Sequence, residues 1–267
     1  MPFPITERVS YKHTPLVQVI CQLRFPTILK VEAGLPVDFQ ERVRHEFPIF
    51  QEKQLQTAYQ LSAGLKDVLP PEFRGLLPQE SGYNFISADE KWMIGLTKDF
   101  LSLSTSSYSR WEEFSNRLRG PLDSLKQVYP PSFFTRIGLR YQNLIRRSEL
   151  GLTDTAWSDL IQPHLAGILS NNDVGPYVQD SQQVITIELR ENFGKVRIRH
   201  GLAKVEDTGE TAYLIDSDFF IEQRTETGNE AIILDQYHRR AGYLFRWCIR
   251  PQLHDAMEPT SISGNNN

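Results

Sequence analysis

The sequence predicts an α+β fold, in which an antiparallel sheet has long helices packed on one face. Three observations predict it. Many segments alternate apolar and polar residues with a period of two, which is typical of strands with one buried face. Two long segments place apolar residues three and four positions apart, as amphipathic helices do. Several strands follow one another directly in each half, which favours antiparallel pairing.

The first half begins with a clear strand, because Val19, Cys21 and Leu23 alternate with polar residues. The proline-rich stretch 48–82 has no sustained period, and no element is predicted there. The elements expected in this half are a strand at 16–25, a helix at 38–47 capped by Asp38, two or three hairpin-connected strands within 83–107 with turns near Ala88-Asp89 and Lys98-Asp99, and a long helix at 110–128 with a kink at Gly120-Pro121.

The second half shows the same order. Its expected elements are a strand at 133–145, a short helix at 155–169 with Pro163 in its first turns or as a kink, strands at 183–191, 195–204 and 211–223, and a helix at 230–249 stopped by Pro251. A tight turn is expected at Asn192-Phe193-Gly194 and a loop at Asp207-Thr208-Gly209. The last residues, 258–267, are too polar to fold and are expected to be a disordered tail.

The repeated element order indicates an internal duplication, with one α+β half at residues 1–130 and a second at 131–257. Side-chain identity between the halves is slight, so the duplication depends on element order and spacing alone. In that order, the chain resembles the duplicated helix-grip folds, with halves like those of the TATA-binding protein. The resemblance implies one antiparallel sheet, or two related sheets, with helices on one side.

Composition limits the function classes. The chain has 29 Lys and Arg against 33 Asp and Glu, a net charge of -4, so no global positive field attracts nucleic acid. The only cysteines, Cys21 and Cys248, exclude a disulfide framework and fall on apolar faces where thiols are generally inert. The N-terminus has no signal-peptide pattern, and no apolar run is long enough to span a bilayer. These features predict a soluble cytoplasmic protein without a membrane partner.

One strand face of the second half is unusually rich in charge. Alternation places on the side opposite the apolar set the residues Arg136, Arg140, Glu188, Arg190, Lys195, Arg197, Arg199, Asp216 and Asp218. The simplest interpretation is a solvated sheet face whose charges pair across strands. The functional interpretation is a preorganised anion site, because guanidinium groups held on rigid strands lose little entropy on binding. We take as candidate ligand-binding residues Arg136, Arg140, Arg197, Arg199, Asp216 and Asp218.

Two other constellations are weaker. Asp216 and Asp218 project to the same side of a strand and could hold a metal, but no third ligand has suitable spacing and nearby arginines repel a cation. Asp235 and His238 are spaced as an acid–base dyad on one helix, although a surface hydrogen-bonded pair is the simpler interpretation. The chain lacks the sequence motifs of P-loop, dinucleotide-binding, hydrolase-elbow and zincin enzymes. We therefore expect no cofactor, no metal site and no catalytic residue.

Four short segments carry a family resemblance: Tyr11 to Ile20, the Tyr108, Trp111, Phe114 spacing, the strand RIGLRYQN at 136–143, and Asp216-Ser217-Asp218. Through them the chain resembles, over nearly its whole length, a sporadically distributed prokaryotic family of conserved hypothetical proteins. The RIGLRYQN strand is the most specific of these segments. The resemblance implies a cytoplasmic prokaryotic protein of about this length, with no established activity, cofactor or catalytic residue to carry over.

Together these observations predict a non-enzymatic binding or regulatory module that uses its exposed sheet face. A protein partner or another anionic ligand is the expected target, since families of this type often supply one component of a multi-gene system. Three alternatives stay open: a nucleic-acid-binding protein that uses the same saddle, an enzyme with an acidic site around Asp216 and Asp218, and a homo-oligomer whose sheet edges or faces meet across a twofold axis.

Overall fold

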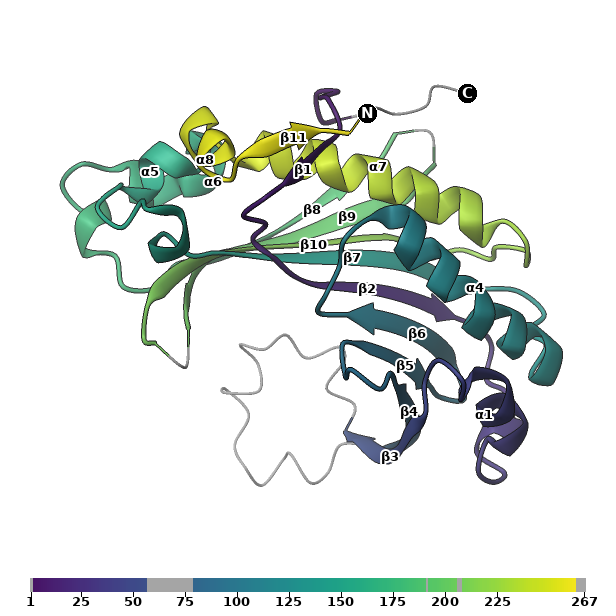
Figure 1. Cartoon of the computed structure of the whole chain (residues 1–267). Helices are drawn as coiled ribbons and strands as arrows, with labels where there is room; N and C mark the ends of the chain where they lie inside the picture. The colour runs from purple at the N-terminus through teal and green to yellow at the C-terminus, as the bar shows by residue number, and fades with distance from the viewer. Residues whose placement is uncertain (1, 57–78, 191, 206–207, 263–267) are drawn as a thin grey trace. The chain divides into compact units, whose positions relative to one another are not determined.

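The computed structural model describes residues 2–56, 79–190, 192–205 and 208–262. The strands are β1 (Val9–Tyr11), β2 (Leu16–Arg24), β3 (Ile49–Gln56), β4 (Gln79–Ile86), β5 (Trp92–Leu96), β6 (Phe100–Thr105), β7 (Arg136–Ile145), β8 (Gln182–Glu188), β9 (Lys195–Lys204), β10 (Thr211–Ile221) and β11 (Pro259–Ser261). The helices are α1 (Val37–Val43), α4 (Trp111–Val128), α5 (Trp157–Leu160), α6 (Pro163–Ala166), α7 (Glu230–Cys248) and α8 (Pro251–Ala256) (Figure 1).

Nine of the strands in the described ranges form one hydrogen-bonded sheet, in the order β3-β4-β5-β6-β2-β7-β10-β9-β8. The pairs for which a register is defined are antiparallel. The prediction of an α+β chain with a large antiparallel sheet is therefore confirmed. The expected loop residue Asp207, most of the proline-rich stretch (57–78) and the last residues (263–267) lie outside the described residues.

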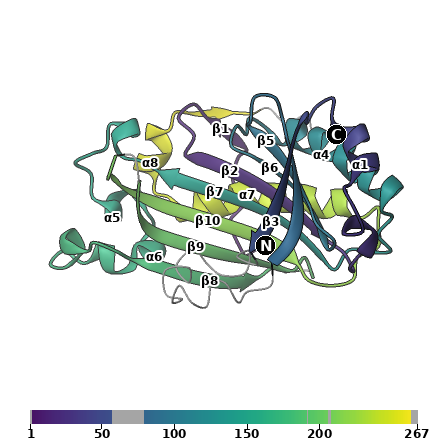
Figure 2. The same ribbon diagram turned by 90° about the horizontal axis from the view of Figure 1, so that it is seen from below.

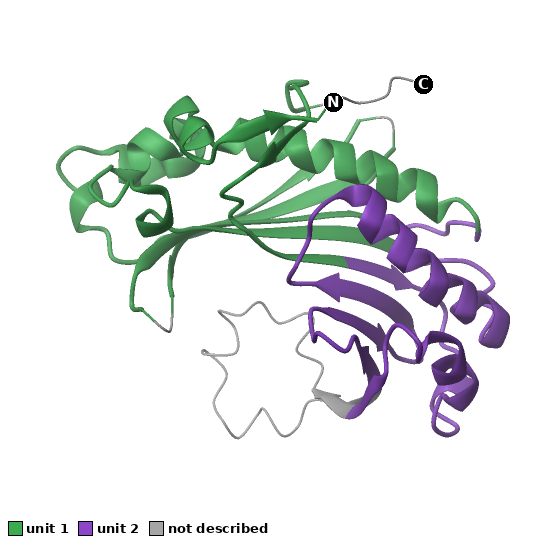
Figure 3. Ribbon diagram, viewed as in Figure 1, with its two compact units in different colours: residues 1–20, 137–222, 228–267 green, residues 21–136, 223–227 purple. Residues whose placement is uncertain are grey.

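The chain divides into two compact units (Figure 3). Unit 1 comprises Met1–Ile20, Ile137–Glu222 and Gly228–Asn267, and unit 2 comprises Cys21–Arg136 and Gln223–Thr227. Strand β2 contributes residues to both units, because the division falls between Ile20 and Cys21. Each unit is described by itself below. The duplication into halves at 1–130 and 131–257 stays a prediction.

In unit 1, helix α7 covers one face of the strands β7, β10, β9 and β8. The ring of Phe219 on β10 lies 6.0 Å from the ring of Tyr237 on α7, and both side chains are fully buried. Burial of such large apolar side chains is the main favourable term that holds the helix to the sheet. Figure 2 shows the same strands from below, in front of α7, so that their opposite face is seen.

The helix predicted at 155–169 is instead divided into α5 and α6. Between them Ile161 and Gln162 are extended, with Gln162 at φ -60° and ψ 143°. The physical reason is Pro163, whose ring disfavours helical geometry in the residue before it and occupies the first position of α6. The prediction that Pro163 begins or kinks a helix was right, but a continuous helix was wrong.

The C-terminal tail is ordered further than the sequence predicted. Pro259–Ser261 form β11, which pairs antiparallel with β1 so that Tyr11 lies opposite Pro259. The prediction of a disordered tail from 258 is therefore wrong for its first residues. Polar composition did not exclude this strand, because a β ladder is made by main-chain groups that every residue except proline can offer.

Unit 2 packs α4 against its own strands. The ring of Phe114 on α4 lies 5.7 Å from the indole of Trp92 on β5, and both are buried. The hairpin strands predicted within 83–107 and the long helix at 110–128 correspond to β4, β5, β6 and α4, whereas β3 was not predicted. Helix α1 is shorter than expected, and Pro36 rather than Asp38 occupies its N-cap position.

No helix among the described residues combines the length and apolar character that crossing a bilayer requires.

Candidate binding face on unit 1

Contacts to α7 show which side of each strand faces the helix. On β7, the Tyr141 hydroxyl lies 3.1 Å from Nδ1 of His238 on α7. On β10, Phe219 contacts Tyr237 of the same helix. Because side chains alternate along a strand, the even-numbered residues of β7 and β10 project from the opposite face. Those residues include Arg140, Asp216 and Asp218.

Strand β9 completes this face through its register with β10. Arg199 lies directly opposite Asp216, and Arg197 lies directly opposite Asp218. On the other side of β10, Asp218 lies opposite Arg140 of β7. Cross-strand partners share a face, so the structure brings five of the six predicted residues together. We call this set the arginine face: Arg140, Arg197, Arg199, Asp216 and Asp218.

Asp216 is the centre of the arginine face. Its side chain is 4% exposed, and its carboxylate accepts hydrogen bonds from Nε of Arg140 at 2.7 Å and from Nη2 of Arg140 at 2.5 Å. Nη1 of Arg199 lies 3.5 Å from the second carboxylate oxygen. A two-point pair between arginine and a carboxylate fixes both position and orientation of the guanidinium. One carboxylate therefore orients Arg140 and also contacts Arg199, and this trio has a net positive charge.

Solvent reaches the cations but hardly the carboxylate. The side chain of Arg140 is 32% exposed and that of Arg199 is 22% exposed. Arg197 is more exposed, and its guanidinium lies over the ring of Phe220 at 5.6 Å from the centroid. Within the described ranges Arg197 makes no ion pair. It is thus the guanidinium that the arginine face presents most openly to a ligand.

Arg136 is the predicted residue that the structure does not place in the arginine face. It is the first residue of β7 and belongs to unit 2, where its Nη1 donates to Oε1 of Gln22 at 3.2 Å. Strand periodicity puts Arg136 on the same side of β7 as Arg140. The arginine face as defined here is nevertheless confined to unit 1.

The outer strand β8 adds residues that were not singled out as candidates. Val184 lies opposite Arg199, Thr186 opposite Arg197, and Glu188 opposite Lys195. Val184 is 58% exposed, so an apolar side chain stands beside the cations. The alternation of 183–191 places Val184 and Thr186 on this side. Neither residue is charged, so the charge pattern alone did not identify them as part of the surface. Arg190 lies beyond the end of β8.

The pairing of Asp216 bears on the acidic-site alternative. A metal ion at Asp216 would have to replace two guanidinium partners, one of them held through two hydrogen bonds. Asp218 is half-buried between Arg140 and Arg197 in the strand register. In the part of the chain that the structure describes, no group of three or more His, Cys, Asp or Glu side chains is placed to hold a metal.

The remaining candidates of unit 1 have structural partners. His238, which the sequence spaces with Asp235 as a dyad or a hydrogen-bonded pair, shares a hydrogen bond with Tyr141 of β7. Cys248 is fully buried, and burial raises the pKa of its thiol far above the usual range. A buried thiol with a raised pKa is a poor nucleophile.

His200 is a buried histidine on the helix-covered side of β9. Its Nδ1 lies 2.9 Å from the Tyr213 hydroxyl, which donates to the Leu165 carbonyl at 3.3 Å. Burial is the larger cause that lowers the pKa of His200, and the charge on His164 adds to it. His200 is therefore held neutral.

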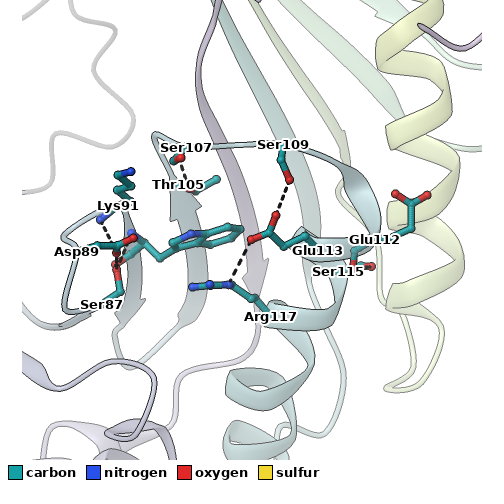
Figure 4. Close-up of polar contacts among 11 residues, drawn as sticks. Ser87, Asp89, Lys91, Thr105, Ser107, Ser109, Glu112, Glu113, Ser115 and Arg117 are labelled. Atoms are coloured by element: carbon teal, nitrogen blue, oxygen red, sulfur yellow. Dashed lines mark hydrogen bonds and ion pairs between the residues drawn. The ribbon is translucent and has the colours of Figure 1, made fainter. Parts of the chain in front are cut away.

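Unit 2 has its own cluster of polar side chains (Figure 4). The Ser87 hydroxyl donates to Oδ1 of Asp89 at 2.6 Å, and the Lys91 backbone N–H donates to the same oxygen at 3.2 Å. These bonds, that from Ser87 above all, lower the pKa of Asp89. All of them close the turn between β4 and β5, where such short-range bonds are the rule.

The second part of this cluster stabilises the start of α4. The Ser109 hydroxyl donates to the Glu113 carboxylate, which also pairs with Nε of Arg117 at 3.8 Å one helical turn later (Figure 4). The Arg117 guanidinium lies 4.5 Å from the centre of the Trp92 indole. The side chains of Ser87, Asp89, Ser109, Glu113 and Arg117 thus each have a local structural partner.

No family model and no curated protein matches the chain.

Proposed function

We propose that the protein is a non-enzymatic binding or regulatory module that engages an acidic surface of a protein partner through the arginine face. The observation that supports this most is the burial of Asp216 between Arg140 and Arg199. The carboxylate holds the Arg140 guanidinium in a fixed orientation through two hydrogen bonds, and contacts that of Arg199 at 3.5 Å, before any ligand arrives. Preorganised cations lose little conformational entropy on binding, so more of their interaction energy contributes to affinity.

The charge of this side of the sheet suits a carboxylate ligand of limited size. Within unit 1, the strands β7 to β10 carry on this side four cations, Arg140, Lys195, Arg197 and Arg199, against three carboxylates, Glu188, Asp216 and Asp218. The net charge of +1 is local, on a chain whose total charge is -4. A positive patch on a negative protein directs an acidic partner to one place and repels it elsewhere.

Nucleic acid is the weaker candidate for the same face. A polyanion is held by many phosphate contacts, each made by a Lys or Arg whose charge is available. Here Asp216 already occupies the guanidinium groups of Arg140 and Arg199, and Asp218 lies between Arg140 and Arg197 in the register. A protein surface that combines carboxylates with apolar groups fits better, because Val184 is exposed beside Arg199. We place the acidic-enzyme alternative last, because Asp216 is ion-paired.

We also propose three further properties that the sequence predicts. The first is that the chain is an internal duplication with helix-grip halves; each unit combines antiparallel strands with one long helix, α4 or α7. The second is membership of the sporadic prokaryotic family that the RIGLRYQN strand suggests. The third is a cytoplasmic location, which the composition and the two buried thiols favour.

The test compares two charge reversals in the same unit. Arg197→Glu changes the exposed cation of the arginine face, whereas Arg239→Glu makes the same change at an exposed position of α7. Tagged chains are expressed in the native host, and nuclease-treated complexes are analysed for protein and nucleic acid at two salt concentrations. We expect one protein at fixed stoichiometry with the wild type and with Arg239→Glu, and about tenfold less of it with Arg197→Glu.

Equal retention of that protein by the wild-type, Arg197→Glu and Arg239→Glu chains would overturn the proposal. The nucleic-acid alternative would be favoured by a different result. In that case nucleic acid is retained before nuclease treatment, and less of it is retained at higher salt and by the Arg197→Glu chain. Circular dichroism of both variants confirms that the fold is unchanged, as expected for exposed positions.

A further inference from the structure

The outer edge of β8 is available for another strand. In the strand order of the described residues β8 comes last, and its only hydrogen-bonded neighbour is β9. The ends of the β8–β9 ladder show which backbone groups are used. The Leu202 N–H donates to the Ser181 carbonyl at 2.8 Å, and the Leu189 N–H donates to the Gly194 carbonyl at 2.8 Å.

Both of these bonds involve odd-numbered residues of the β8 segment. In an antiparallel pair, alternate residues direct their N–H and C=O groups to the neighbouring strand and the residues between them direct theirs away. The even-numbered residues of β8 therefore direct four N–H and four C=O groups outward, and none of these makes a hydrogen bond within the described ranges. They belong to Gln182, Val184, Thr186 and Glu188.

The strand β8 itself has none of the sequence features that usually prevent strand addition. Edge strands are commonly protected by proline, lysine, a bulge or short length. Strand β8 pairs with β9 over seven consecutive residues without a bulge, and its sequence QQVITIE has one charge, at its end. Val184 is 58% exposed on it. An uncharged run rich in β-branched residues at a free edge favours pairing with a further strand.

We infer that this edge pairs with β8 of a second copy of the chain, antiparallel about a twofold axis at Ile185. In this register Gln182 lies opposite Glu188 of the partner subunit, and Val184 opposite Thr186 of the partner subunit. Each of these symmetric pairs is a hydrogen-bonded pair. All eight outward groups on each chain are then satisfied, because the four even-numbered residues pair with one another.

The sequence is self-complementary in this register only. A shift by two residues leaves one of the four outward residues without a partner, and a larger shift toward the C-terminal end of β8 brings two Glu188 carboxylates together. A shift by one residue is excluded, because it would use groups already bonded to β9. In the inferred register the Gln182 amide faces a carboxylate, and no like charges are opposed. This self-complementarity favours a second copy over an unrelated peptide.

Phe193 and Gly194, which directly precede β9, are held by neighbouring elements. The Tyr237 hydroxyl donates to the Phe193 carbonyl at 3.0 Å, and the Arg240 guanidinium lies 4.2 Å from the centre of the Phe193 ring. Gly194 completes the turn at φ 82°, where a Cβ would lie 2.1 Å from the Phe220 carbonyl oxygen. An edge held this firmly to α7 and β10 loses little entropy when a second strand adds.

The experiment measures the dimer dissociation constant by sedimentation for the wild type and for a matched pair of variants at exposed Gln182. Gln182→Glu opposes two carboxylates twice per dimer, whereas Gln182→Lys places an ammonium opposite each Glu188. We expect Gln182→Glu to weaken the dimer about 2- to 30-fold and Gln182→Lys to strengthen it over a similar range, since each cross-strand pair contributes roughly 0.2–1 kcal/mol.

A third variant, Val184→Pro, removes an outward N–H without touching the bonds to β9, and is expected to give a monomer with an unchanged circular dichroism spectrum. The inference is overturned if the wild type is monomeric at millimolar concentration. Binding of an unrelated peptide to the β8 edge would not rescue it, because the inferred partner is a second copy of the chain. It is equally overturned if a dimer forms whose dissociation constant is the same for Gln182→Glu and Gln182→Lys. If Val184→Pro unfolds the chain, the Gln182 pair alone decides.

Discussion

Replacing Asp216 by asparagine removes one negative charge from the centre of the arginine face and changes almost nothing in shape. Of the two hydrogen bonds from Arg140, at 2.7 Å and 2.5 Å, one then loses its acceptor and the other loses its charged acceptor, and Arg199 loses its charged partner at 3.5 Å. Asparagine retains one oxygen that accepts a hydrogen bond. In place of the second carboxylate oxygen it has an amide N–H₂ group, which cannot accept a hydrogen bond from a guanidinium. We expect Asp216→Asn to destabilise the folded chain.

The magnitude follows from the hydrogen bonds and the exposure of the cations. A hydrogen bond to a charged group contributes roughly 1.5–3 kcal/mol, so the two bonds from Arg140 set an upper range of about 3–6 kcal/mol. The guanidinium groups are 32% and 22% exposed at the side-chain level, so water replaces part of what is lost. We expect the free energy of unfolding to fall by about 2–3 kcal/mol and the melting temperature by roughly 4–12 °C.

Urea unfolding followed by circular dichroism measures this change at a concentration low enough to keep the chain monomeric. The matched control is Glu188→Gln, which removes an exposed carboxylate from the same side of the sheet and should alter the free energy of unfolding by less than about 0.5 kcal/mol. If Asp216→Asn is as stable as Glu188→Gln, the carboxylate does not hold the guanidinium groups, and the reasoning about preorganisation is wrong.

Three further predictions concern residues outside the arginine face. Gly201→Ala should lower the free energy of unfolding by more than about 2 kcal/mol, because φ of Gly201 is 144° and a Cβ would lie 1.8 Å from the Ser181 carbonyl oxygen. Chemical denaturation measures this change, and an unchanged free energy of unfolding would refute the close approach. Because the folded-state pKa of His200 is lowered from 6.5, stability is full above about pH 6.5 and falls as pH drops through the lowered value. His200→Gln should flatten part of that slope in denaturation curves at pH 5 to 8, and an unchanged slope contradicts it. Cys21 and Cys248 should react with a thiol reagent only after unfolding, whereas rapid labelling of the native chain would contradict their burial.

Periodicity was sufficient to predict which residues of the arginine face share a side. Around Arg140, Arg199 and Asp216 the charged residues alternate with apolar or small ones, so these three could be placed opposite the apolar set from the sequence. Their pairing could not be predicted. Register decides that Asp216 faces Arg199 rather than another residue of β9, and register depends on contacts between segments far apart in the chain.

Most of what could not be predicted depends on tertiary contacts. The polar segment Pro259–Ser261 becomes a strand because β1 offers it a partner, which is a tertiary effect invisible to local composition. The break before Pro163 is local, and the sequence did indicate it. The depth of burial of Asp216 could not be predicted either, because exposure of a side chain on an outer sheet face depends on the length of its neighbours' side chains.

Site-specific photo-cross-linking in the native host tests the central claim most directly. A benzophenone amino acid replaces Lys195, an exposed residue two positions from Arg197 on the same side of β9; the control position is Ile232, which is 63% exposed on α7. The account predicts that position 195 yields a covalent adduct with one acidic protein and that position 232 does not. Adducts of equal yield at both positions, or an adduct with nucleic acid at position 195, would contradict it.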